Sequence, residues 1–332
     1  MDKTVAQIIN KALDGGEIAA AEIGKLFAVH YLSEESFLLQ QASRKMSAAA
    51  AKGKAEVHGQ VGIDNGPCPK KCAYCSFAAQ HDVFPEPKVY APEDIIAKCL
   101  ELEAAGANAI YLMATAAVPL ADYLRIARKV RTALQPDTPL VANIDDFDEA
   151  GARALVQAGI AGIYHCVRLG EGEVTAIDPA VRVRTIKAAK QAGLLFGTSV
   201  GPVGPEHTLP ELVATTVLTR ELKPTNSACV RRINIPGLPL TAHGSMNYGQ
   251  MAHLLAAVRL ACGYGVTGFG THEPNGMGAM AGANLFWAEQ GANPRDTSED
   301  TVRGWTVGQA RALLAEAGWE VLDGPSVMFG RR

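Results

Sequence analysis

The fold is decided by Val57-His-Gly-Gln-Val-Gly-Ile63 and the loop that follows it, Gly66-Pro-Cys68-Pro-Lys-Lys-Cys72-Ala-Tyr-Cys75. The first segment has the composition of a buried strand, and the Gly-Pro pair predicts a turn directly after it. The three cysteines therefore lie on a loop at the C-terminal end of a strand.

Three thiolates that converge on one centre leave one coordination position open. A structural zinc site normally has four protein ligands, usually as two separated pairs, and this chain has no second CxxC pair. A cubane iron–sulfur cluster suits three soft thiolates better, because its fourth iron stays free for a small molecule. A zinc site, a disulfide pair and a chance grouping are the alternatives.

From Val57 onward, short apolar runs alternate with helical patterns, which is the signal of βαβ units. We expect an α/β fold, a (β/α)8 barrel of the TIM type, in which chemistry occurs on the loops at the C-terminal ends of the strands. The cysteine loop falls at one of these ends. The predicted strands are 57–63, 109–113, 140–143, 162–167, 194–200, 229–235, 265–270 and 284–288.

Segments on both sides of the barrel are predicted to be helical. Residues 1–53 form an N-terminal helical extension, with Ser33 as a candidate N-cap, which we interpret as a lid or plug packed on the barrel. The barrel spans 54–305. Residues 306–332 form a C-terminal helix and tail, with the helix lying beyond the barrel.

The composition excludes several classes of partner. The net charge of −3 favours neither nucleic acid nor an anionic membrane surface. The polar N-terminus does not resemble a signal peptide, and no apolar run reaches the roughly 18 residues of a membrane span. The cysteine usage, with three of seven clustered, fits the reducing cytoplasm, where we expect the protein.

The CxxxCxxC spacing, with the aromatic Tyr74 before the last cysteine, resembles the signature of the radical S-adenosylmethionine (SAM) enzymes. The resemblance implies that Cys68, Cys72 and Cys75 hold a catalytic [4Fe–4S] cluster whose open iron chelates SAM. It further implies reductive cleavage of SAM to a 5′-deoxyadenosyl radical, which removes hydrogen from a small-molecule substrate. A one-electron donor such as flavodoxin or ferredoxin is the implied partner.

The same resemblance assigns five residues to SAM binding. Tyr74 adjoins the last cysteine, and Thr115 lies where the family has a Gly-Gly-Glu-like turn, although 113–117 lacks those residues and could be a plain strand exit. Glu171 is the candidate for the ribose hydroxyls. Arg182 matches an arginine that binds the methionine carboxylate, with a solvated surface arginine as the alternative. Val200 lies in a stretch whose backbone contacts adenine.

Polar residues at other strand ends are candidates for binding substrate. Asn143 and Asp145 follow the third strand, where Asp145 or Asp146 could instead cap the next helix. Arg168 ends the fourth strand. His272, near the seventh, could transfer a proton, bind substrate or be a satisfied buried histidine. Together with Cys166 and Arg231, which we also expect to face the lumen, this set favours a carboxylated or amino-acid-like substrate.

The resemblance is greatest to the biotin synthase group, which also contains methylornithine synthase and hydrogenase maturases. It extends beyond the cysteine loop to Arg182 and to Met280-Ala-Gly-Ala-Asn284-Leu-Phe. Biotin synthase holds a second, two-iron cluster between three barrel cysteines and an arginine. By rough alignment, this chain has at those places Leu112, Asn143, Gly197 and Thr267.

Four activities follow from these observations. The resemblance favours biotin synthase-like sulfur insertion into dethiobiotin with a non-standard auxiliary cluster, for which Cys166 and Cys229 are candidate ligands unless they only pack. Rearrangement or cleavage of a carbon skeleton, and hydrogenase-cofactor biosynthesis, need no second cluster. A non-catalytic iron–sulfur carrier is the alternative from another class. The chain could also form a homodimer.

Overall fold

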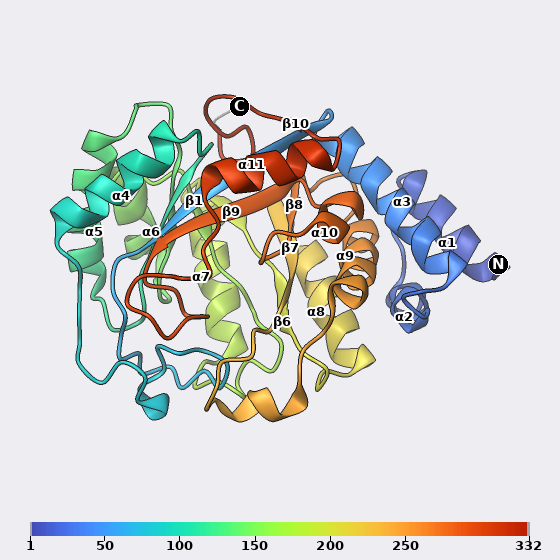
Figure 1. The fold of residues 1–332 in the computed structure, drawn as a ribbon, viewed down its shortest axis with the longest axis horizontal. Helices are drawn as coiled ribbons and strands as arrows, with labels where there is room; N and C mark the ends of the chain where they lie inside the picture. Colours follow the sequence, from blue (N-terminus) through green and yellow to red (C-terminus); the bar gives the residue numbers. More distant parts are fainter. Residues whose placement is uncertain (1, 331–332) are drawn as a thin grey trace.

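A computed structural model describes residues 2–330 as a barrel of parallel strands with helices around it (Figure 1). The barrel closes because β9 pairs with β1, giving the spatial order β1-β2-β3-β4-β5-β7-β8-β9. The predicted (β/α)8 TIM-type fold is confirmed. The strands are β1 Lys54–Gly62, β2 Ile110–Met113, β3 Leu140–Asn143, β4 Gly162–Tyr164, β5 Leu195–Gly197, β6 Val200–Val203, β7 Asn226–Arg231, β8 Gly268–Gly270, β9 Leu285–Gly291 and β10 Glu320–Val321.

Each barrel strand is followed by a helix on the outside of the ring. The capping box predicted at Thr208 and Glu211 is present, with each side chain accepting a hydrogen bond from the other's backbone amide. In the described part of the chain, no helix has the length and apolar character needed to cross a bilayer. The ring helices are α4 Pro92–Ala104, α5 Leu120–Ala133, α6 Glu149–Gln157, α7 Pro179–Gln191, α8 Leu209–Leu222, α9 Tyr248–Cys262, α10 Gly276–Met280 and α11 Val307–Glu316.

Most predicted strand ends differ from the observed ends by up to three residues, and two predicted strands differ more. The fifth is divided into β5 and β6, and the sixth, β7, begins at Asn226 instead of 229. Asn226 and Ser227 are polar but fully buried, so a search for apolar runs passes over them. Gly197 makes room for this strand, because a Cβ there would lie 2.4 Å from the Asn226 side-chain oxygen.

The N-terminal helices form an outer layer. α1 (Lys3–Leu13), α2 (Ala20–Ala28) and α3 (Glu34–Ala50) pack beside α8 and α9 at the side of the barrel (Figure 1). Ser33 caps α3 as predicted, accepting from the Ser36 amide at 3.3 Å. No residue of 2–53 lines the cavity at the barrel mouth, so their interpretation as a lid or plug is wrong.

The C-terminal segment closes the opposite end of the barrel. α11 packs against β9 and β1 as the eighth ring helix, so its predicted place beyond the barrel is wrong. After β10, the tail bonds to the buried Glu56 of β1, which accepts from the Ser326 hydroxyl and from the Val327 amide at 3.0 Å. Met328 and Phe329 pack into the lumen. Whether the chain divides at 53 and 305 remains a prediction.

Candidate active site

A cavity opens at the C-terminal ends of the strands, and every barrel strand or its following loop contributes to the wall. Most of the residues predicted for the site meet there. Glu171, Val200 and Cys229 do not line it. The predicted residues in the wall are Cys68, Cys72, Tyr74, Cys75, Thr115, Asn143, Asp145, Cys166, Arg168, Arg182 and His272.

The cysteine loop is held from two sides by its backbone. The Ala176 amide donates to the Lys70 carbonyl at 2.7 Å, which ties the loop to the turn after β4. The Ser76 amide donates to the Pro294 carbonyl at 3.0 Å, which ties it to the loop after β9. The position of the cysteine loop is therefore fixed by the barrel rather than by the loop alone.

The three loop thiols fit an iron–sulfur cluster. All three are unpaired, half-buried and in the wall of one cavity. Burial raises the pKa of Cys75 to about 12, so a metal would have to displace its proton. In residues 2–330 no three His, Cys, Asp or Glu side chains converge on a single ion. A cubane requires less convergence, because each cysteine binds a different iron.

Arg182 is buried beside the β4 end of the cavity, which excludes a solvated surface arginine. Its Nη1 lies 3.3 Å from Asp146 Oδ2, and its Nε lies 3.9 Å from Glu171 Oε2. Asp146 also accepts from His165 Nε2 and from the Thr185 hydroxyl, both at 2.9 Å. Burial alone would raise the pKa of Asp146, but these hydrogen bonds and the arginine charge hold it at about 2.

The Glu171 carboxylate forms its hydrogen bonds within the turn that carries it. Its carboxylate accepts from the Arg168 amide at 2.9 Å and from the Thr175 hydroxyl at 3.2 Å. Both oxygens are directed into the turn, so the structure does not bring Glu171 to the cavity as the ribose role requires. The carboxylate instead positions Arg168, which lines the cavity, and Arg182.

Thr115 and Val200 lie in backbone segments that approach the cavity. The Thr115 amide and hydroxyl both donate to the buried Asp64, at 2.8 and 2.6 Å, so Asp64 fixes this turn. The Val200 side chain packs into the outer core, while its neighbour Gly201 lines the cavity. A Cβ at Gly201 would lie 2.5 Å from the Val230 carbonyl oxygen. The SAM contacts predicted for both segments remain predictions.

Asn143 and Asp145 line the cavity after β3. Asp145 pairs with Lys70 of the cysteine loop at 2.9 Å. The helix α6 is capped by Asp148, which accepts from the Gly151 amide at 2.9 Å, so neither Asp145 nor Asp146 is the cap. Asp145 therefore lines the cavity, whereas Asp146 lies behind the wall and holds Arg182.

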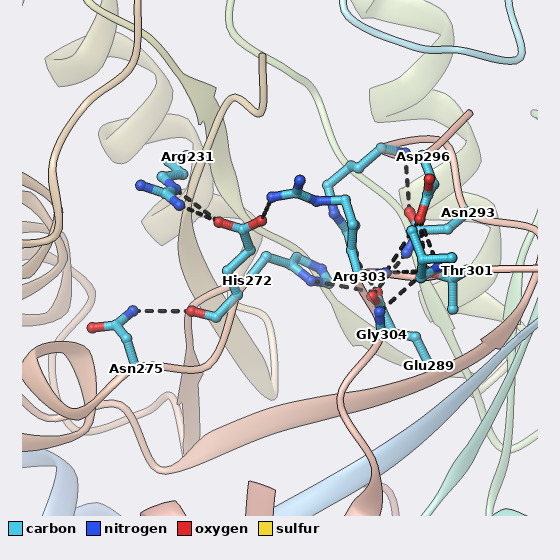
Figure 2. A network of polar contacts seen from close by, with 12 residues as sticks. Arg231, His272, Asn275, Glu289, Asn293, Asp296, Thr301, Arg303 and Gly304 are labelled. Atoms are coloured by element: carbon cyan, nitrogen blue, oxygen red, sulfur yellow. Dashed lines mark hydrogen bonds and ion pairs between the residues drawn. The ribbon is translucent and has the colours of Figure 1, made fainter. Parts of the chain in front are cut away.

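The wall from β7 to β9 is built from ion pairs (Figure 2). His272 stacks on Trp287, with ring centroids 4.7 Å apart, and burial lowers its pKa well below the usual value, so the ring is neutral at pH 7. Glu289 accepts a hydrogen bond from Arg295. The sequence analysis did not name Arg295 as a site residue. Its position in Asn293-Pro-Arg295-Asp296, a polar stretch after the last strand, was the available signal.

The candidate ligands of a second cluster lie on different faces. Cys166 lines the cavity, with its Sγ 3.4 Å from Ser199 Oγ. Ala228 and Val230 of β7 face the lumen, so alternation directs Cys229 into the outer core. The auxiliary cluster predicted on Cys166 and Cys229 therefore cannot be held by this pair.

Comparison with known proteins agrees with this architecture, although no family model matches the sequence. Biotin synthase from Xanthomonas campestris pv. campestris is 25% identical over 299 residues, which cover 84% of this chain and 85% of that protein. Biotin synthase from Carboxydothermus hydrogenoformans is 25% identical over 206 residues, covering 58% of this chain and 62% of that one.

Two solved structures share the fold. The FeFe-hydrogenase maturase HydG from Carboxydothermus hydrogenoformans superposes with a TM-score of 0.80 at 17% identity, over 99% of this chain and 81% of HydG. Methylornithine synthase (PylB) superposes with a TM-score of 0.78 at 15% identity, over 97% of this chain and 98% of PylB.

A closed (β/α)8 barrel with a CxxxCxxC loop at its mouth defines a radical SAM enzyme. The sequence similarity to biotin synthases extends over most of the chain. The relatives and the shared fold together support a biotin synthase-like radical SAM enzyme.

Proposed function

We propose that this enzyme uses the radical derived from SAM to rearrange or cleave the carbon skeleton of a small substrate, without a second cluster. One observation carries the proposal. Of the four cysteines outside the loop, Cys166 is the one that lines the cavity, and all seven cysteines lie in the described part of the chain. A two-iron cluster takes four protein ligands, which these cysteines do not supply.

Three groups of residues would have separate roles in this reaction. Cys68, Cys72 and Cys75 would hold a [4Fe–4S] cluster, which supplies the electron that cleaves SAM to the 5′-deoxyadenosyl radical. Arg182, held by Asp146, would bind the methionine carboxylate through its guanidinium fork. Tyr111, Tyr164 and Trp287 form a packed floor, which keeps water away from a radical intermediate.

The iron content tests this proposal. Anaerobically reconstituted wild type is expected to hold about four irons, and the Cys68/Cys72/Cys75 triple alanine variant none, by iron and sulfide analysis with Mössbauer spectra. Iron retained in the variant would mean an auxiliary cluster on other residues. Sulfur insertion, which the names of the curated relatives favour, would then replace rearrangement or cleavage as the proposed reaction.

SAM cleavage tests the catalytic role of the loop. With dithionite and SAM, wild type should release 5′-deoxyadenosine, Cys72→Ala should release none, and Cys262→Ala, altered in the outer core, should match wild type. Full cleavage by Cys72→Ala refutes the assignment. No cleavage by wild type would favour the iron–sulfur carrier, which the enclosed position of the loop argues against.

The remaining expectations extend the proposal. Hydrogenase-cofactor biosynthesis also requires no second cluster, and the shared fold with HydG is its support. A flavodoxin or ferredoxin would deliver the electron. The unpaired state of all seven cysteines fits the cytoplasm. A homodimer remains a prediction.

A further inference from the structure

Cys166 is a free thiol in the wall of the cavity, and the proposed function gives it no role. It follows β4, on the side of the barrel that carries Arg168 and Arg182. Its side chain is 2% exposed and packs with the residues of the lumen. The other cysteines outside the cysteine loop lie in the outer core, namely Cys99, Cys229 and Cys262. Cys166 is therefore the thiol outside the loop that a molecule in the cavity can contact.

A serine and a tyrosine connect to this thiol. Ser199 Oγ lies 3.4 Å from Cys166 Sγ, and the Tyr164 hydroxyl donates to Ser199 Oγ at 2.9 Å. All three side chains are buried and line the cavity. A serine hydroxyl has one hydrogen to donate. When Ser199 donates it to the sulfur, the S–H group of Cys166 is free to point into the cavity.

The register of the barrel brings these three side chains together. Tyr164 and Cys166 are two residues apart, so alternation along the strand directs both into the lumen. Tyr164 is the register partner of Gly197 on β5, and the His165 amide donates to the Gly197 carbonyl at 3.0 Å. Ser199 follows two residues after Gly197. The group is therefore assembled by strand pairing before any ligand binds.

Tyr164 retains its hydrogen and is shielded from water. Burial raises its pKa well above the usual value, so the phenol stays protonated at pH 7. The rings of Trp287 and Tyr111 approach it edge-on, with centroids at 6.5 and 6.3 Å. These rings close the lumen behind the phenol, which protects a radical on it from side reactions.

Gln60 provides an independent indication that a molecule occupies the lumen in front of this group. It is 2% exposed and lines the cavity, and its Oε1 has no hydrogen-bond partner among the described residues. A buried acceptor without a partner is unfavourable by about 1–3 kcal/mol, which a donor on a ligand would relieve. In the ring order β1 lies three places from β4, so Gln60 and Cys166 face the cavity from nearly opposite walls. A molecule bound against Gln60 would have its other side toward Cys166.

We propose that Cys166 is a hydrogen-atom donor that converts a carbon radical in the cavity into a closed-shell product, and that Tyr164 restores the thiol through Ser199. Cleavage of a carbon skeleton by a radical leaves one fragment with an unpaired electron, and this fragment needs a hydrogen atom. The transfer is favourable because an S–H bond is weaker than the aliphatic C–H bond that forms. The inference rests on the proposed function, because it requires a carbon radical in this cavity.

The atoms and electrons balance in three steps. First, the S–H bond of Cys166 breaks homolytically and a C–H bond forms, which leaves a thiyl radical. Second, Tyr164 gives an electron to the sulfur, its proton passes to Ser199 Oγ, and the Ser199 proton passes to Sγ. The thiol is restored and a tyrosyl radical remains. Third, one electron from the flavodoxin or ferredoxin and one proton from water return Tyr164 to the phenol.

The origin of the hydrogen can be measured without the substrate, because the 5′-deoxyadenosyl radical is then the acceptor. Cluster-loaded enzyme is incubated with dithionite and SAM in D2O, in which S–H groups exchange and C–H groups do not. Wild type should release 5′-deoxyadenosine with one added deuterium by mass spectrometry. Cys166→Ser should lose this deuterium, because an alcohol O–H bond is too strong to donate. Cys229→Ser, altered in the outer core, should retain it.

Tyr164→Phe tests the second step. Freeze-quenched wild type should show a tyrosyl radical in its EPR spectrum, and Tyr164→Phe should lose the signal while its 5′-deoxyadenosine still gains deuterium. Deuterium that persists in Cys166→Ser, or that is absent from wild type, would overturn the proposal. Deuterium lost in Tyr164→Phe but kept in Cys166→Ser would make the phenol the donor, which also overturns it. Melting temperatures show whether the variants keep the fold.

Alkylation gives a readout that needs no turnover. Iodoacetamide added anaerobically to the cluster-loaded enzyme should label Cys166 faster than Cys229, as measured by peptide mass spectrometry. Equal or slower labelling of Cys166 would show that the cavity does not give access to the thiol, and would overturn the proposal. Release of 5′-deoxyadenosine without deuterium would refute this inference and leave the proposed function standing. No release by wild type would refute the function itself.

Discussion

Exchanging Asp146 for asparagine isolates the negative charge that holds Arg182 in the wall of the cavity. The amide keeps the shape of the carboxylate and can still accept from His165 or Thr185 through its one oxygen. Its nitrogen is a donor, however, and cannot replace Oδ2 opposite Arg182, which now lies at 3.3 Å. The variant thus leaves a buried arginine with one acid in place of two.

The pKa of Asp146 gives the expected loss of stability in the Asp146→Asn variant. A fall from 3.8 to about 2 in the folded protein corresponds to roughly 2 kcal/mol of stabilisation by the ionised form. Removing one partner of an isolated buried ion pair costs more, about 3–5 kcal/mol. The smaller value is expected here, because Glu171 remains 3.9 Å from the Arg182 Nε.

Urea denaturation at pH 7 is the assay. Asp146→Asn should lower the unfolding free energy by roughly 2 kcal/mol with an unchanged slope. The pKa is depressed in the folded state, so the stabilisation is complete above the unfolded value of 3.8 and is lost as the pH falls through about 2. The two proteins should therefore differ equally at pH 7 and pH 5 and converge in stronger acid.

Asp148→Asn is the matched control. Asp148 caps α6 only two residues away, and asparagine is an equally good N-cap, so this variant should be close to wild type in stability. Equal stability of Asp146→Asn and wild type at pH 7, or a difference that widens in acid, would refute the electrostatic account. If Arg182 binds the methionine carboxylate, Asp146→Asn should also weaken SAM binding while its iron content stays unchanged.

Three further variants, one of them with a matched control, test other parts of the molecule. Glu56→Gln removes the buried charge that binds the tail and should lower the unfolding free energy in urea by about 3 kcal/mol; a change below 1 kcal/mol would contradict that role. Gly201→Ala should destabilise by about 1–3 kcal/mol, because its Cβ would meet Val230, whereas Gly308→Ala, in open space on α11, should be neutral or stabilising. Cys166→Ser should leave the iron content of reconstituted protein unchanged, and lost iron would reveal an auxiliary ligand.

Periodicity in the sequence was sufficient to predict the barrel, because alternating strand and helix patterns report local burial. The strand ends then predicted the site, and most of the residues singled out there do line the cavity. Strand β7 was misplaced because its first residues, Asn226 and Ser227, are polar and buried. Their burial depends on neighbouring strands, which a local pattern does not record.

Whether a strand residue points into the lumen or into the outer core was harder to predict than the position of the strand. A shift of one residue moves a side chain to the other face, so Cys229 could be placed only once Ala228 and Val230 were seen in the lumen. Leu112, which the rough alignment placed at the position of a cluster cysteine, likewise faces the outer core instead of the lumen. Glu171 was predicted to reach the cavity but does not, because a carboxylate near a cavity can turn back to its own backbone, as it does toward Arg168.

Closure of the barrel explains why the wall around Arg295 could not be predicted from the order of residues along the chain. Gln60 and Glu289 are far apart in sequence and become register partners only when β9 meets β1. Below them Trp287 lies under His272, and the lumen is filled down to the tail by aromatic and apolar side chains. SAM and substrate must therefore share the cavity above this floor.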